Sequence, residues 1–271
     1  MYFEVDGKRA FASTGGKAYD SAKPTVIFLH GSGLDHTFWG LYSRFFAFRG
    51  YGVLCPDYPG HTNSEGPPLA TIESIADWLN NVVETLGANN LSLVAHSQGC
   101  LVALEFASRH PERLKSVSFI ASGLATPVNA ALIDAAEKSP EAAIAMMTSW
   151  GFGSAGHLSQ GPIPGNSMLA GGQKVMRGNV PGELAADLRA CDAYTNGKDA
   201  AAAIAGRDCP RQVILAGKDR MAPRKAGMEL VAHLDGPELT VVEESGHMLP
   251  LEAPDRCRRL LRDFIFRHNP A

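Results

Sequence analysis

The sequence has no long apolar run and no cluster of basic residues. None of its 271 residues falls in a stretch approaching 18 uninterrupted apolar residues, the length that indicates a membrane-spanning helix. Lysine and arginine number 25 against 28 aspartate and glutamate, and no basic stripe carries interleaved aromatics. We therefore expect neither a membrane protein nor a nucleic-acid-binding protein.

Metal-binding motifs and a disulfide framework are missing as well. The 5 cysteines are an odd number and widely spaced, without a C-x-x-C pair, and there is no H-E-x-x-H motif. The opening residues, MYFEVDGKRAFAST, lack the apolar core of a secretory signal. These absences predict free thiols, no metal site and a cytoplasmic location.

What the sequence does contain is an alternation of buried strands and amphipathic helices. An Asp6-Gly7 turn indicates an opening hairpin. Apolar runs of strand length then recur between helical patterns, at residues 25–29, 51–55, 91–95, 114–121, 212–216 and 239–242. Strands that alternate with helices predict an α/β fold, with a mostly parallel twisted sheet and helices on both faces.

The alternation breaks once, between residues 123 and 205. This stretch holds alanine-rich helical pieces around a Gly/Pro/Ser-rich segment at residues 151–167, which we interpret as a flexible loop. A literal G-x-G-x-x-G in that segment has the wrong context for a nucleotide site, because a helix precedes it. We predict a core domain of residues 1–122 and 206–271. Residues 123–205 would form a helical cap (lid) above the carboxyl edge of the sheet, where such folds bind ligands.

The junction at Ser97 is a candidate for a catalytic nucleophile. A predicted strand ends just before it and a predicted helix starts just after it, which places the serine on a sharp, strained turn. The residues two positions away must be small, and Ala95 and Gly99 are, although glycine is commoner at the first position. A simple helix N-cap is the alternative interpretation of this serine. We expect Cys100, one turn further on, to be a core residue.

Two later strand ends supply the partners that a nucleophilic serine needs. Asp219 follows one strand and His247 follows the next. A serine hydroxyl becomes reactive when an imidazole takes its proton and a carboxylate holds that imidazole in one tautomer. We predict Ser97, Asp219 and His247 as a catalytic triad. The alternative interpretations are an ordinary turn residue for Asp219 and a hydrogen-bonded loop histidine for His247. Glu243 and Glu244 are expected to be solvated.

Backbone N–H groups near Ser97 could stabilise the oxyanion of acyl transfer. We predict one donor at Gln98, which begins a helix, and the other at Ser32 in the His30-Gly31-Ser32-Gly33 loop, with Gly33 as its nearest competitor. Candidate substrate contacts are Gly33, Met146 and Trp150. The histidines at positions 30 and 96 are expected to bond the backbone, and His61 to close a turn.

Taken in order, HGSG, PDYPGH, AHSQG, GKD and ESGH resemble the α/β-hydrolase superfamily, over about residues 25–266. The resemblance is to the carboxylesterase, lactonase and C–C-bond hydrolase branches. It implies the α/β-hydrolase fold and a Ser-His-Asp mechanism without metal or organic cofactor. Serine at position 97 excludes the aspartate-based chemistry of epoxide hydrolases and haloalkane dehalogenases.

The resulting hypothesis is a serine hydrolase that cleaves a carboxylic ester or related acyl bond. The same triad would also serve acyl transfer, perhydrolysis or C–C bond cleavage, and the fold can carry a non-catalytic small-ligand receptor. The expected partner is a small, largely apolar ester-like molecule, with no nucleic acid and no membrane. We expect the chain to be a monomer or a homodimer.

Overall fold

The computed structural model describes residues 1–158, 165 and 167–271. In these ranges, strands form one sheet of eight, in the spatial order β1-β2-β4-β3-β5-β6-β7-β8. The strands are β1 (Tyr2–Val5), β2 (Lys8–Ser13), β3 (Thr25–Leu29), β4 (Gly52–Pro56), β5 (Leu91–His96), β6 (Leu114–Ile120), β7 (Arg211–Ala216) and β8 (Glu238–Val242).

The sheet is parallel from β4 to β8, and β1 and β2 add an antiparallel hairpin at one edge. The turn of that hairpin has positive φ at both central residues, 52° at Asp6 and 71° at Gly7, as a two-residue hairpin turn requires. Strands β3 to β6 are almost continuously buried, because helices cover both of their faces. The predicted α/β fold and hairpin are confirmed.

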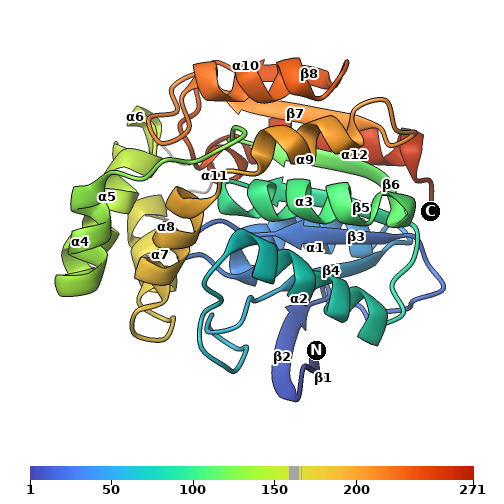
Figure 1. The fold of residues 1–271 in the computed structure, drawn as a ribbon, viewed down its shortest axis with the longest axis horizontal. Coiled ribbons are helices and arrows are strands. Elements are labelled where there is room, and N and C mark those ends of the chain that lie inside the picture. Colours follow the sequence, from blue (N-terminus) through green and yellow to red (C-terminus); the bar gives the residue numbers. More distant parts are fainter. Residues whose placement is uncertain (159–164, 166) are drawn as a thin grey trace.

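Helices form a layer on each face of this sheet (Figure 1). Helices α2, α3 and α10 contribute to one hydrophobic cluster, and α1 and α12 to the other. The helices outside the insertion are η1 (His36–Trp39), α1 (Gly40–Ala47), α2 (Ile72–Thr85), α3 (Gln98–Arg109), η2 (Pro111–Arg113), α10 (Arg224–His233), α11 (Leu249–Glu252) and α12 (Pro254–His268). Within the described part of the chain, no helix combines the length and apolar character needed to cross a membrane.

The insertion between β6 and β7 is helical, and most of it gathers at one end of the sheet (Figure 1). Its helices are α4 (Ala130–Lys138), α5 (Pro140–Gly151), α6 (Ser154–His157), α7 (Met168–Met176), α8 (Glu183–Ala193) and α9 (Gly197–Ile204). Residues 151–167 are not simply a loop, since α6 begins at Ser154 within them. Residues 159–164 and 166 of that expected loop lie outside the described residues.

Helix α9 lies inside the range 123–205 predicted as cap, but it packs on the sheet layer. It contacts α3 and α10, and its alanines join the same hydrophobic cluster as α2 and α3 (Figure 1). The chain can pass close to Leu124 at the start of α9 because residue 197 is glycine: a Cβ there would lie 1.7 Å from the carbonyl oxygen of Leu124. The helices above the sheet edge therefore end with α8.

Strand β3 and helix α3 pass close together beside Ser97, so a larger residue at position 99 should destabilise the fold. A Cβ on Gly99 would lie 2.6 Å from the carbonyl oxygen of Leu29 and 2.7 Å from that of His30. We expect Gly99→Ala to lower the free energy of unfolding by about 1–3 kcal/mol, because backbone must shift to admit the methyl group. Gly40→Ala is the matched control, since its Cβ would meet nothing within 4 Å. Equal unfolding midpoints for the two variants in urea would show that the passage is not tight.

Candidate active site

Ser97 occupies the turn between β5 and α3 in a backbone conformation that serine rarely adopts. Its φ is 53° and its ψ is -122°. A non-glycine residue with positive φ is strained, and such strain persists where the surrounding structure enforces it. Ser97 is also partly exposed, whereas its neighbours His96 and Gln98 are buried. The turn therefore presents the hydroxyl to the space above the sheet edge.

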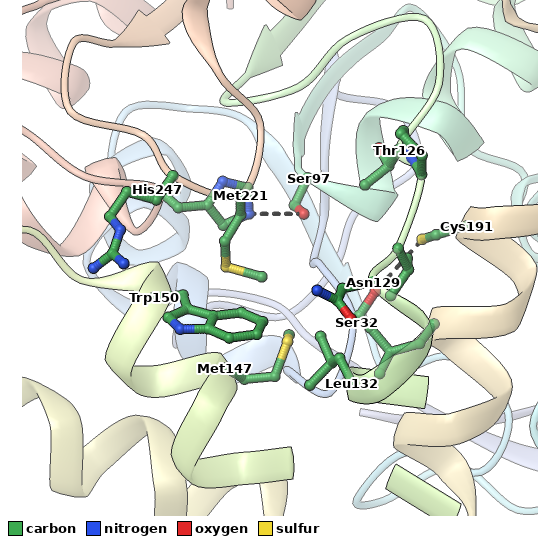
Figure 2. A pocket seen from close by; sticks show the side chains of 14 residues that line it. Ser32, Ser97, Thr126, Asn129, Leu132, Met147, Trp150, Cys191, Met221 and His247 are labelled. Atoms are coloured by element: carbon green, nitrogen blue, oxygen red, sulfur yellow. Dashed lines mark hydrogen bonds between the residues drawn. The ribbon is translucent and has the colours of Figure 1, made fainter. Parts of the chain in front are cut away.

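The structure brings the three predicted triad side chains into one hydrogen-bonded chain. The Oγ of Ser97 lies 2.9 Å from Nε2 of His247, and Nδ1 of the same ring lies 2.8 Å from Oδ2 of Asp219 (Figure 2 shows the first contact). The carboxylate accepts, so Nδ1 carries the proton and Nε2 is left to accept the proton of the hydroxyl. This is the tautomer that a general base for Ser97 requires.

Asp219 is held in its ionised form. Its other oxygen, Oδ1, accepts the backbone N–H groups of Met221 and Ala222, each at 2.8 Å. Burial alone would raise the pKa of this carboxyl, but His247 and the two N–H groups together lower it below its usual range. The carboxylate is therefore available to orient the imidazole at neutral pH.

The loop that carries His247 is fixed by two residues. Nε2 of His96 donates to the carbonyl oxygen of His247 at 2.9 Å, and burial together with the nearby His247 lowers the pKa of His96 to about 3. Glu252 accepts the N–H groups of Gly246 at 3.1 Å and Gly153 at 3.0 Å, which ties this loop to the insertion. The backbone role expected for His96 is observed, whereas the role of Glu252 was not predicted from the sequence.

Ser32 and Gln98, the candidate oxyanion donors, differ from Gly33, the alternative donor, in whether the backbone N–H already has a hydrogen-bond acceptor. The N–H of Gly33 donates to Oδ2 of Asp187 at 3.0 Å. Within the described residues, no hydrogen bond from the N–H of Ser32 or Gln98 is found, and Ser32 lines the cavity beside Ser97. The structure therefore favours Ser32 over Gly33 as the donor from this loop.

A cavity of about 310 Å³ lies over Ser97 and His247, between the sheet edge and the insertion (Figure 2). Much of its wall is apolar, formed by Leu132, Met147, Trp150, Leu188 and Met221. Asn129 and Thr126 add polar groups, and Arg220 also lines it. The cavity can enclose a small to medium-sized substrate with its reacting carbon at Ser97.

Of the three predicted substrate contacts, Trp150 lines this cavity and the other two do not. Met147 lines it and Met146 does not, although both lie within about one turn of Trp150 on α5. Gly33 does not line it either. Its N–H is bonded to Asp187, and a Cβ there would meet Leu184 and Met176 of the insertion.

A second buried group of titratable side chains lies under the same loop. His61, Glu183 and Asp187 form the one group of possible metal ligands within the described residues, with donor atoms within 4.8 Å of one another. Nε2 of His61 lies 3.1 Å from Asp187 and 2.6 Å from Glu183, while Nδ1 donates to the carbonyl oxygen of Pro59 at 3.2 Å. Both ring nitrogens thus face acceptors, so an imidazolium accounts for the arrangement.

The charges within this group balance. Burial alone would lower the pKa of His61, but the two carboxyl groups raise it well above its usual value. Burial and the nearby Asp187 raise the pKa of Glu183 to about 8, so it keeps its proton at neutral pH. Asp187 stays ionised, with a lowered pKa, because His61 outweighs the effect of burial. His61 does close its turn as expected, but its pairing with α8 was not anticipated.

The chain belongs to the alpha/beta hydrolase family, whose model matches residues 26–260. It is 28% identical over 264 residues to a pimeloyl-(acyl-carrier protein) methyl ester esterase of Neisseria meningitidis serogroup C, covering 92% of this chain and 96% of that one. It is 27% identical over 264 residues to a 2-hydroxy-6-oxononadienedioate/2-hydroxy-6-oxononatrienedioate hydrolase of Klebsiella pneumoniae, covering 90% and 88%.

Solved structures show the same fold. The enol-lactonase of Burkholderia xenovorans superposes with a TM-score of 0.86 at 22% identity, over 98% of this chain and 99% of that one. A thermophilic esterase of Thermogutta terrifontis superposes with a TM-score of 0.84 at 19% identity, over 99% of each chain. The protein is thus an α/β-hydrolase, and its relatives support an esterase-like activity.

Proposed function

We propose that the chain is a serine hydrolase that cleaves a carboxylic ester or a closely related acyl bond. The observation that carries this proposal is the contact of 2.9 Å between Ser97 Oγ and His247 Nε2, with Asp219 2.8 Å behind the ring. These distances meet the requirement that a nucleophile and its base lie within hydrogen-bond reach. The names of the esterase and hydrolase relatives support the same class of reaction.

The proposed reaction proceeds in two halves. Ser97 Oγ attacks the carbonyl carbon as His247 Nε2 takes the hydroxyl proton, and the oxyanion meets the N–H groups of Ser32 and Gln98. Collapse of this intermediate breaks the ester C–O bond, and His247 returns the proton to the leaving alcohol. A water then loses its proton to His247 as it attacks the acyl-enzyme, and His247 returns that proton to Ser97 Oγ as the acid is released. The residues in these steps need neither a metal nor an organic cofactor.

The substrate that fits this site is a small, largely apolar ester. A cavity of about 310 Å³ with walls of Leu132, Met147 and Met221 favours hydrocarbon over charge. The enol-lactonase and esterase among the solved relatives are named for the same type of bond. We propose that a small molecule, rather than nucleic acid or membrane, is the partner, and that the chain acts as a monomer or a homodimer.

C–C bond hydrolysis is the second candidate. A relative at 27% identity is named as a hydrolase of a dienedioate, an acidic carbon chain. Arg220 lines the cavity and is exposed, so it offers a cation to a carboxylate at the mouth of the site. Release of a shortened acid from a carbon–carbon substrate, at a rate exceeding that of ester hydrolysis, would favour this candidate.

The test is turnover of p-nitrophenyl esters from acetate to decanoate, combined with labelling by a fluorophosphonate. The proposal predicts hydrolysis, with highest kcat/KM for the short and medium chains, and one phosphonyl group on the peptide that contains Ser97. Product analysis with added alcohol or peroxide separates hydrolysis from acyl transfer and perhydrolysis. Binding of esters without turnover or labelling would instead indicate a receptor.

The wall formed by α5 gives a prediction about chain length. Trp150→Ala removes an indole from the cavity, so we expect the ratio of kcat/KM for decanoate to that for butyrate to rise about 3- to 10-fold. Met146→Ala is the matched control, because it lies on the same helix but not in the cavity wall. An unchanged ratio in Trp150→Ala, or an equal rise in both variants, would contradict this placement of the acyl chain.

We also propose a cytoplasmic location. The support is chemical: all five cysteines are free and buried, which suits a reducing compartment.

Burial raises the pKa of Cys100 to about 12 and likewise that of Cys191, so neither thiol is activated as a nucleophile.

A further inference from the structure

The loop that would supply an oxyanion donor is held by one segment of the insertion. The N–H of Gly33 donates to Oδ2 of Asp187 at 3.0 Å, and the carbonyl oxygen of Gly33 accepts Nδ2 of Asn179 at 3.0 Å. Asn179 Nδ2 also lies 2.9 Å from Oε2 of Glu183. Both polar groups of Gly33 are therefore fixed by residues 179–187, which are far from it in sequence.

This anchoring decides which N–H of the loop can face the substrate. Gly33 has a φ of 70°, a left-handed conformation that turns the chain sharply after Ser32. Because the N–H of Gly33 points to Asp187, it is not available to an oxyanion over Ser97. The preceding N–H, that of Ser32, remains as the donor. Helix α8, which carries Asp187, also approaches the side chain of Ser32, with Cys191 Sγ 3.6 Å from Ser32 Oγ.

A bare carboxylate in this place would oppose catalysis. Asp187 is buried, and an uncompensated negative charge next to the oxyanion loop would disfavour a second negative charge on the substrate. His61 removes this conflict, because its Nε2 donates to Oδ2 of Asp187 at 3.1 Å. The same carboxylate oxygen thus joins the imidazolium on one side and the N–H of Gly33 on the other.

We propose that Asp187, charge-balanced by His61, is the positioning residue of the oxyanion loop: it holds the Ser32–Gly33 peptide through the N–H of Gly33, and thereby fixes the adjoining Gly31–Ser32 peptide so that the N–H of Ser32 faces the reacting carbonyl. This inference rests on the proposed serine hydrolase function. It assigns a catalytic consequence to a residue of the insertion that contacts neither the substrate cavity nor the triad. It also makes α8 part of the oxyanion site and not merely part of its roof.

The test compares Asp187→Ala and Asp187→Asn with Asp192→Asn, an exposed position on the same helix. Active sites are first counted by fluorophosphonate titration, and kcat is then expressed per titrated site with p-nitrophenyl butyrate. We expect Asp187→Ala to lower kcat about 10- to 100-fold with little change in KM, because the N–H donor is misplaced in the transition state. Asp187→Asn keeps an acceptor for Gly33 but loses the ion pair, so its fall should be smaller, about 3- to 10-fold. Asp192→Asn should match the wild type.

A second measurement separates positioning from folding. A trifluoromethyl ketone forms a tetrahedral adduct with Ser97 whose oxygen occupies the oxyanion site, so its inhibition constant should rise in parallel with the loss of kcat/KM. A merely structural role would reduce the number of titrated sites and leave both quantities unchanged per site, which would overturn the proposal. If Asp187→Ala does not fold, wild-type kcat and inhibitor affinity in Asp187→Asn would overturn it equally. Absence of turnover and labelling in the wild type would instead refute the proposed function, and this inference with it.

Discussion

Ser97→Ala is expected to lower kcat/KM for p-nitrophenyl butyrate by about 10⁴- to 10⁶-fold. The alanine cannot form the acyl-enzyme, so only substrate binding and the oxyanion donors remain to accelerate attack by water. Labelling by a fluorophosphonate should disappear in the same variant, as a mass shift on the peptide that contains residue 97. Because the side chain is small and partly exposed, we expect the thermal midpoint to stay close to that of the wild type.

Ser108→Ala is the matched control for this experiment. It makes the same substitution at the other end of α3, where the hydroxyl donates to the carbonyl oxygen of Glu105 at 2.8 Å and lies outside the cavity. It should retain wild-type turnover and labelling. If Ser97→Ala kept more than about a tenth of the wild-type kcat/KM, the activity would have to come from another nucleophile.

The meeting of the three proposed triad residues could be predicted because it depends on rules that are local or topological. The strand-to-helix turn at Ser97 follows from a change in periodicity over a few residues, and it appears in the structure as a φ of 53°. Asp219 and His247 each follow a strand, and the carboxyl ends of parallel strands meet at one edge. The sequence therefore brings these residues to one place without any knowledge of side-chain packing.

The support around the triad could not be predicted in this way. Glu252 contacts Gly153 across 99 positions, and His61 contacts Asp187 across 126. These contacts depend on how the insertion sits on the sheet, which no local pattern specifies. A partly buried glutamate and a buried aspartate on helices leave at most a weak signal, since isolated acidic residues on helices are usually solvated.

Helix phase and packing explain the remaining differences. A rotation of α5 by one residue decides whether Met146 or Met147 faces the cavity, and a helical pattern alone does not fix that rotation. Helix α7 contains adjacent glycines, Gly171 and Gly172, which favour a loop on propensity. It forms against this propensity because it packs on α5 and α6.

The substitution Asp219→Asn is expected to lower kcat by about 10⁴-fold while leaving the protein folded. The amide oxygen can still accept the N–H groups of Met221 and Ala222, so the turn is retained. The amide nitrogen then faces Nδ1 of His247, which forces the ring proton onto Nε2 and removes the base from Ser97. Glu243→Gln and Glu244→Gln are the matched controls, because they lose an exposed carboxylate just after β8. A full loss of activity in either control, with Asp219→Asn still active, would contradict the assignment. The carboxylate that orients His247 would then lie after β8 and not after β7.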